Sequence, residues 1–304
     1  LCRTPEEYEA WDEFVLSYPG AHYSQLYGWL SSYEAMGFAC DVMVSTRGGR
    51  VVAGAAFVSI KVPLLSSRVF ILPHAPLCDE MDDASWFTVM DALDQEFRRQ
   101  RAIYAQTWPH VARTDLAALE KYVVAGYVGP ELSRAHSFSS TFLGIRLHGR
   151  NEEEILAGFR QETRYHLRKS EKMGHTLRFG RTKEDLKRSY DLLRANAEYH
   201  GFEPRPYSSL EMAFERLLSK DRACLIQAWK DDALAGTMLL LLAGRTATYY
   251  CGAIDRRFGR LYPSEFIHLQ ALRYAKGRGL EAYDLMNWVH PGVEQFKRGF
   301  RPEE

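Results

Sequence analysis

The sequence predicts an α/β protein built from two similar halves, and three observations lead to that fold class. The chain has 304 residues, enough for about two domains with cores of their own. Helical and strand-like patterns alternate along it. Their order in residues 1–145 returns in residues 146–304, although the letters do not repeat. We therefore expect two tandem domains, each a mixed sheet flanked by helices.

In the first half, the apolar spacing indicates helices, a hairpin and two further strands. Thr4 begins a typical helix start, with Pro5 in the first turn and acidic Glu6 and Glu7 at the positive end of the helix dipole. Apolar residues alternate on both sides of two adjacent glycines, which predicts a hairpin. The expected order is helix 4–18, helix 25–36, strands 40–45 and 51–61, strand 68–72, helix 85–100 and strand 102–107.

The second half shows the same order of patterns. Asn151 and Glu154 form a capping box at a helix start. Asp231 and Asp232 separate two apolar runs, which predicts a second hairpin. The expected elements are helices 151–173, 184–199 and 209–218, strands 223–230, 235–242 and 246–251, helix 263–277 and strand 282–286.

Composition excludes several classes of protein. Lys plus Arg and Asp plus Glu both number 39, so no overall field attracts the chain to nucleic acid or membrane, and any polyanion site must be local. The five cysteines are scattered without metal spacing, which indicates reduced thiols, a cytoplasmic location and no zinc site. The longest apolar run, residues 233–243, is too short to span a bilayer.

Basic residues gather in residues 160–188, which hold ten Lys or Arg against four Asp or Glu. On a helix, the residues spaced four apart would form one basic stripe, with Lys169 beside it: Arg160, Arg164, Arg168 and Lys172. Like charges at this spacing repel each other unless an anion meets them, which favours a phosphate-rich ligand. The alternative is a solvated helix face held by a few ion pairs.

Residues 283–300 look like a site at the end of a strand. We expect the strand to leave Asp284 and Asn287 near its end, as ligand contacts or as strand-end caps. After Pro291 and Gly292, the chain is expected to form a tight basic turn made of Phe296, Lys297, Arg298 and Gly299. The alternative for Lys297 and Arg298 is a solvated charge pair.

Two further segments carry candidate groups. Residues 200–207 form a loop with two prolines, which lose little entropy on ordering, and this loop presents Arg205. Arg205 is either a bidentate phosphate clamp or the ion-pair partner of Glu203. Tyr249 and Tyr250 end an apolar strand, so one faces the core and the other is a candidate site phenol.

Taken together, these segments resemble the Fem family of aminoacyltransferases. The resemblance covers nearly the whole chain and rests on residues 25–29, 72–79, 160–174, 201–207, 249–252, 262–263 and 283–284, and on the ending Gln-Phe-Lys-Arg-Gly-Phe at 295–300. It implies two tandem acetyltransferase-like (GNAT) domains. It also implies transfer of an amino acid from aminoacyl-tRNA to an amine, usually the stem-peptide amine of a peptidoglycan precursor.

The resemblance also implies roles for individual residues. It places Lys297, after Phe296, at the reaction centre, and it maps the arginine that binds the precursor's diphosphate onto Arg205. The other expected substrate contacts are Trp29, Tyr207, Tyr250 and Asn287. Tyr207 is a possible substitute for a family tyrosine, because Ser209 stands at that position, and the lysine usual after the early tryptophan is absent. The residues expected to contact the tRNA backbone are Arg160, Arg164, Arg168, Lys169, Lys172 and Arg298.

Such a transfer asks little of the protein because the aminoacyl ester is already activated. Positioning and a positive charge on the oxyanion suffice, and Lys297 could supply that charge. Asp284, or a backbone carbonyl near Phe296, could take the proton of the attacking amine. No metal or organic cofactor is expected, since aminoacyl-tRNA is the co-substrate. A lipid-linked acceptor would add peripheral membrane contact.

Three alternatives remain at this point. The first is an acyl-CoA-dependent N-acyltransferase on the same fold, whose pyrophosphate loop would fall at residues 256–261. Leu261 stands there in place of the small residue that such a loop needs. The second is a tRNA-dependent peptide ligase of natural-product biosynthesis. The third is a binding module without activity.

Overall fold

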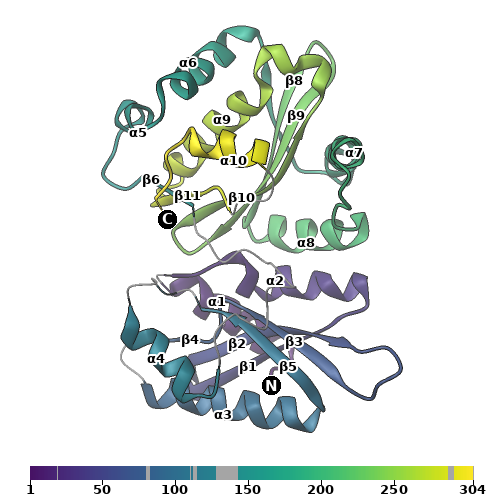
Figure 1. Ribbon diagram of the computed structural model, residues 1–304, viewed down its shortest axis with the longest axis vertical. Helices are drawn as coiled ribbons and strands as arrows, with labels where there is room; N and C mark the ends of the chain where they lie inside the picture. Colours follow the sequence, from purple (N-terminus) through teal and green to yellow (C-terminus); the bar gives the residue numbers. More distant parts are fainter. Residues whose placement is uncertain are drawn as a thin grey trace. The chain divides into compact units, whose positions relative to one another are not determined.

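The computed structural model describes residues 1–18, 20–79, 83–109, 111, 115–127, 143–286 and 291–303. The chain divides into two compact units, Leu1–Phe138 and Ser139–Glu304, each with a sheet and covering helices (Figure 1). The division falls a few residues before the expected boundary of 145 and 146, because strand β6 (Gly144–Arg146) pairs with the sheet of the second unit. Among the described residues, no helix combines the length and apolarity that crossing a membrane requires.

The first unit is built on a sheet with strand order β1-β2-β3-β5, and β4 pairs with β2. Neighbouring strands are antiparallel except β3 and β5, which are parallel. Its core joins one sheet face to helix α3, with Phe57, Phe70, Leu93 and Phe97 fully or almost fully buried. The elements are α1 (Pro5–Ser17), η1 (Tyr23–Gln25), α2 (Tyr27–Leu30), η2 (Ser31–Met36), β1 (Ala39–Arg47), β2 (Arg50–Lys61), β3 (Arg68–Pro73), β4 (Leu77–Cys78), α3 (Asp83–Arg99), β5 (Ala102–Trp108) and α4 (Leu116–Val124).

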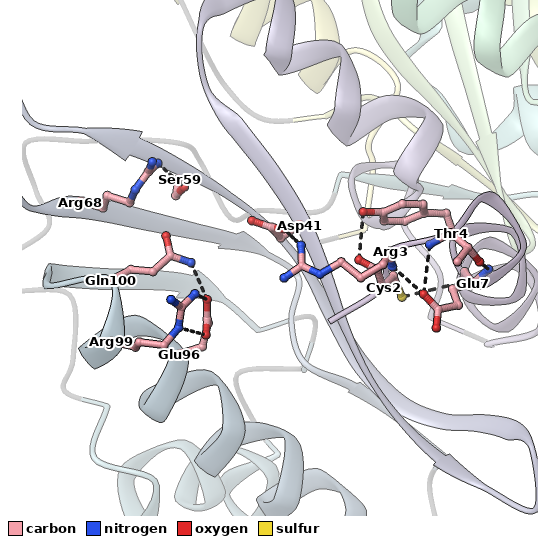
Figure 2. A network of polar contacts seen from close by, with 11 residues as sticks. Cys2, Arg3, Thr4, Glu7, Asp41, Ser59, Arg68, Glu96, Arg99 and Gln100 are labelled. Carbon is pink, nitrogen blue, oxygen red and sulfur yellow. Dashed lines mark hydrogen bonds and ion pairs between the residues drawn. The ribbon is translucent and has the colours of Figure 1, made fainter.

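Helix α1 begins as the sequence predicts. Thr4 caps it, and the side chain of Glu7 accepts hydrogen bonds from the backbone N–H groups of Arg3 and Thr4 (Figure 2). The expected single helix over residues 25–36 is wrong, because η1, α2 and η2 stand in its place. The reason is Gln25, whose side chain is buried and bonds the backbone of Ala56 and Pro73, which leaves the next residue, Leu26, extended.

The second unit is built on a six-stranded sheet with the order β6-β11-β10-β9-β8-β7. All pairs are antiparallel except β10 and β11. Helices α7 and α8 lie on one side of this sheet, and α9 lies on the other (Figure 1). The elements after β6 are α5 (Glu152–Gly158), α6 (Gln161–Ser170), η4 (Glu171–Met173), β7 (Thr176–Gly180), α7 (Lys183–His200), α8 (Tyr207–Ser219), β8 (Ala223–Lys230), β9 (Ala233–Ala243), β10 (Thr246–Ile254), η5 (Arg256–Leu261), α9 (Pro263–Gly277), β11 (Ala282–Asp284) and α10 (Pro291–Arg298).

The two units share one plan, which confirms the predicted duplication. In each, a hairpin (β1-β2 or β8-β9) leads to a strand, a helix and a strand parallel to the first: β3-α3-β5 in one unit and β10-α9-β11 in the other. The parallel pairs differ in extent. β3 pairs with β5 along its whole length, whereas β10 pairs with β11 over three residues only, Thr246 to Thr248.

The expected long helix over residues 151–173 is also wrong. It is divided into α5, α6 and η4, because Phe159 is extended and buried in the core of the second unit. Arg160 therefore caps α6, and its backbone N–H bonds the carbonyl of Gly299 at 2.9 Å. Strands β6 and β7 and helix α4 were not predicted; β6 is only three residues long, and β7 alternates weakly because most of its residues are at least partly exposed.

Candidate functional site

A split between strands β10 and β11 forms the centre of the candidate site. The two strands separate after Thr248 and Asp284, while β10 continues along β9 to Ile254. The β9 register shifts between Tyr249 and Cys251, so Tyr250 is the extra residue of a β-bulge. The split leaves Asp284 at the open end of β11, as the sequence predicts.

Helix α10 carries the candidate catalytic lysine. The expected tight turn around Phe296, Lys297, Arg298 and Gly299 is wrong, since residues up to Arg298 are helical. Glu294 and Arg298 stabilise this helix through an i,i+4 ion pair of 2.7 Å. Lys297 is not part of a solvated charge pair either, because it is 3% exposed and buried.

Burial acts on Lys297 and Asp284 in opposite directions. It lowers the pKa of the Lys297 ammonium to about 8, and the negative charge of Asp284 opposes that shift. Burial raises the pKa of the Asp284 carboxyl to about 6, against hydrogen bonds to its oxygen from the backbone N–H groups of Met286 at 2.8 Å and Leu143 at 3.4 Å. Near neutral pH, the centre therefore holds one buried cation beside one buried carboxylate.

Aromatic rings and one histidine surround this pair. Lys297 Nζ lies 5.5 Å from the centre of the Tyr249 ring, an arrangement that stabilises a cation. His268 of α9 packs against Tyr249, Phe296 and Phe300, with ring centres 4.8 to 5.3 Å apart. Burial and the nearby Lys297 lower the pKa of His268 to about 3, so this ring is neutral.

Sequence reasoning missed His268 because a lone histidine on an apolar helix is more often a core residue. Its Nδ1 lies 2.8 Å from the hydroxyl of Tyr283, so the imidazole is fixed in the core. Tyr249, by contrast, was one of two tyrosines considered, and it is the one that packs against the core beside Lys297. Tyr250, half-buried in the bulge, is left as the candidate phenol.

Gly299 brings helix α6 against the end of α10. A Cβ at this position would lie 2.3 Å from Thr163 Oγ1 and 2.9 Å from the Phe296 carbonyl. Glycine is therefore required for the close approach of the two helices. The same contact places Arg160 beside Gly299, so the first turn of α6 lies directly next to the site.

The Arg205 loop lies on the α7 and α8 side of the same sheet. Arg205 Nε donates to Ser209 Oγ at 2.9 Å, so the serine that departs from the family pattern positions this arginine. The charge of Arg205 lowers the pKa of Cys251, which burial nevertheless raises to about 12. Arg205 is therefore close to the bulge of β10, and the structure brings the two segments together. The ion pair with Glu203, one of the two alternatives for Arg205, is not among the ion pairs of the described residues.

The remaining predicted substrate contacts are Tyr207, Trp29 and Asn287. Tyr207 turns its hydroxyl to Glu211 Oε1 at 3.1 Å, and burial and that carboxylate raise its pKa to about 12. Trp29 is buried inside the first unit, edge-on to Tyr23. Asn287 lies outside the described residues.

The predicted basic stripe is only partly a free surface. Arg164 bonds the carbonyls of Ala157 and Phe159 and so closes the end of α5. The other basic side chains of the group, Arg160, Arg168 and Lys172, are exposed, and no ion pair holds them within the described part of the chain.

Lys169 and two tyrosines form an aromatic and basic cluster at the other end of α6. Lys169 Nζ lies 4.9 Å from the ring centre of Tyr262 and 5.5 Å from that of Tyr165, which is 58% exposed. His166 stacks on Tyr262 with ring centres 4.7 Å apart. Arg298, the last residue expected to contact tRNA, is half-exposed on α10 and paired with Glu294.

This arrangement suits acyl transfer. A buried cation at the open end of a split sheet is placed to stabilise negative charge that develops on a carbonyl oxygen, and low local polarity strengthens that effect. Among the described residues, no group of His, Cys, Asp and Glu is arranged to hold a metal ion.

Comparison with known proteins identifies the fold. The acetyltransferase (GNAT) domain family matches residues 157–298, which include Arg205, Tyr250, Asp284 and Lys297. The chain is similar to the crystal structure of FemX over 100% of its own length and 94% of that chain, with a TM-score of 0.87 and 19% identity. No curated protein sequence matches it.

Two further solved structures share the arrangement. L-PGS from Bacillus licheniformis is similar over 99% of this chain and 89% of that one, with a TM-score of 0.57 and 15% identity. A tandem GNAT protein from the clavulanic acid biosynthesis pathway, solved without AcCoA, is similar over 100% and 93%, with a TM-score of 0.52 and 14% identity. The chain therefore has a tandem GNAT fold of the kind seen in FemX.

Proposed function

We propose that this chain, with its tandem GNAT fold, is an aminoacyltransferase that moves an amino acid from aminoacyl-tRNA to an amine of a peptidoglycan precursor. The observation that carries the proposal is Lys297, a lysine buried beside Asp284 where β10 and β11 separate. The likeness to FemX and the resemblance of the chain's ending to the Fem family support the same reading.

The reaction follows from these groups. The acceptor amine attacks the ester carbonyl of the donor, and the ammonium of Lys297 stabilises the oxyanion that forms. The amine loses a proton to the carboxylate of Asp284, and a backbone carbonyl near Phe296 can orient the amine by accepting a hydrogen bond from it. The oxyanion then re-forms the carbonyl as the C–O ester bond breaks, and the ribose oxygen of the tRNA leaves with the proton that Asp284 took from the amine.

Two surfaces support an RNA donor and a phosphate-bearing acceptor. The exposed cations of α6, Arg160, Arg168 and Lys172, suit the backbone of RNA, and the exposed ring of Tyr165 beside Lys169 suits stacking of an unpaired base. Arg205, held by Ser209 close to the β10 bulge, suits the diphosphate of the acceptor.

An acyl-CoA donor is the second candidate, because the matched family is named for acetyl transfer. The start of α9, where such enzymes bind a pyrophosphate, is poorly suited to one in this chain. Pro263 removes a backbone N–H from the first turn, and Glu265 places a carboxyl group there. Burial raises the pKa of Glu265. Whether ionised or neutral, its carboxyl group still lies in the first turn of α9, where a pyrophosphate would bind.

One experiment separates the donors. The protein would be incubated with a muropeptide precursor and either a mixture of tRNAs charged with radiolabelled amino acids or radiolabelled acetyl-CoA. We expect label in the muropeptide from charged tRNA only. Label from acetyl-CoA alone would overturn the proposed donor and keep the fold. Binding of tRNA and muropeptide without any transfer would indicate a binding module.

A further inference from the structure

The connection between β2 and β3 carries two exposed leucines at its tip, Leu64 and Leu65. Leu64 is fully exposed, with φ at 64°, and Leu65 is 52% exposed. The left-handed backbone of Leu64 is unfavourable for a branched side chain, and no packing of that side chain compensates for it. Figure 1 shows this connection projecting from the edge of the first unit. A tip of this kind exposes apolar surface to water without benefit to the fold.

Three positively charged residues lie at the ends of neighbouring strands directly below the tip. Lys61 and Arg68 are opposite each other on β2 and β3, and the backbone N–H of Arg68 bonds the carbonyl of Arg101, just before β5. Arg68 bonds the neutral hydroxyl of Ser59 at 2.9 Å (Figure 2), and no ion pair holds the three cations within the described residues. Like charges directly opposite on neighbouring strands destabilise a sheet.

The acidic residues of α3 that precede Arg101 do not neutralise these three cations. Glu96 of α3 is bonded to Arg99 and Gln100 (Figure 2), and Asp94 is paired with Arg98. From residue 59 to residue 71, which spans the end of β2, the tip and the start of β3, the sequence contains no Asp or Glu. The local charge is therefore positive although the whole chain is neutral.

The start of β5 adds further apolar surface at the same end of the sheet. The β3 to β5 register skips Ile103, which is therefore bulged, and both Ile103 and Tyr104 are exposed. Aliphatic side chains, a tyrosine and unpaired cations together are typical of surfaces that lie in the headgroup region of a bilayer.

We propose that the tip residues Leu64 and Leu65, with the cations Lys61, Arg68 and Arg101, dock the first unit on a membrane surface that carries anionic lipids. The leucines enter the region between headgroups and acyl chains, and the three cations meet lipid phosphates. A protein partner or a second copy of this chain would leave the opposed Lys61 and Arg68 without counter-charges unless it brought acids to them. This inference does not depend on the proposed reaction.

The test is cosedimentation of the intact protein with vesicles, either of phosphatidylcholine alone or of equal parts phosphatidylcholine and phosphatidylglycerol. We expect binding to the anionic vesicles that weakens as salt is raised. Leu64→Ser and Leu65→Ser should each reduce the partition coefficient about tenfold. Lys61→Gln and Arg101→Gln should each reduce it about fivefold, on anionic vesicles only.

Two control variants come from the same unit. Leu116→Ser changes a leucine of α4 that is also exposed, and Arg50→Gln changes an exposed arginine at the other end of β2. Both should bind vesicles as the unchanged protein does. The proposal is overturned if the unchanged protein binds neither vesicle, if the tip variants bind as well as the controls, or if the tip variants alter only self-association in sedimentation velocity.

Discussion

Lys297 and Asp284 are the two residues whose chemistry the fold changes most at the proposed centre. A lysine with a pKa of about 8 is mostly protonated at neutral pH but close to deprotonation, and a carboxyl group with a pKa of about 6 is mostly ionised. Both shifts have burial as their largest cause. Perturbed groups that face each other at the end of a strand are typical of catalytic sites.

The pH dependence of activity follows from these two groups. The proposed mechanism needs Asp284 ionised and Lys297 protonated, so kcat/KM should rise with pH through about 6 and fall through about 8. A profile measured with a donor of fixed ester stability checks this. Activity that keeps rising above pH 9 would show that protonated Lys297 is not required.

Asp284→Asn separates two roles of the carboxylate. If Asp284 accepts the proton, kcat should fall about 100-fold or more and the acidic limb should disappear. If its charge only keeps Lys297 protonated, its loss lowers the pKa of Lys297, so the alkaline limb should move to lower pH with a smaller loss of kcat. A pH profile of this variant, beside the unchanged protein, distinguishes the two. An unchanged profile would contradict both roles.

For single residues, the sequence named candidates that belong to a motif and missed those defined by packing. Lys297 and Asp284 could be named because the ending of the chain is distinctive, and the structure places them near each other, while their roles stay predictions. His268 could not, because its neighbours come from α10 and β10, far away in sequence. Ser209 looked like a departure from the family pattern, and its contact with Arg205 emerged only in three dimensions.

Among the elements, α6 and α10 depend on each other. The sequence predicted a single helix before residue 173 and a turn at residue 296, and both expectations were wrong. The Gly299 contact with Thr163, together with burial of Phe159, sets where α5 ends and α6 begins. Helical periodicity carries no information about a contact between segments so distant in the chain, whereas the hairpins and α1, α3 and α9 are fixed by local pattern and were predicted.

Gly299→Ala tests this dependence. The added Cβ meets Thr163 Oγ1 and the Phe296 carbonyl, so α6 and α10 must separate. We expect a loss of about 1–3 kcal/mol in the free energy of unfolding, measured by urea denaturation, and reduced kcat because Lys297 shifts. Gly259→Ala is the control, since a Cβ there meets nothing within 4 Å. Equal stability of both variants would contradict the required close approach.

Both units of the molecule have the same order of elements, but the parallel strands separate early only in the second unit. In the first unit, β3 and β5 remain paired to Pro73 and Trp108, whereas β10 and β11 separate after three residues in the second. The open end and the buried lysine therefore belong to the second unit. The sequence predicted the duplication from element order, but the difference in pairing depends on register, which element order does not contain.

The balance of charge over the whole chain predicts how tRNA affinity depends on salt. Because positive and negative side chains balance at 39 each, attraction to tRNA must come from local cations. Replacing Arg160, Arg168 and Lys172 by Gln should reduce the salt slope of tRNA affinity by about one unit for each cation. Filter binding over a range of salt concentrations measures this slope. An unchanged slope would place the RNA elsewhere.

The most direct test of the proposed centre compares two lysine variants in aminoacyl transfer. Lys297→Met removes the buried cation, and Lys276→Met removes an exposed one at the far end of α9, the helix that carries His268. In single-turnover transfer from charged tRNA to a muropeptide, Lys297→Met should lose at least about 100-fold in rate, and Lys276→Met should keep the full rate. Full activity of Lys297→Met, with the fold intact by circular dichroism, would contradict the assignment of the centre to the split between β10 and β11.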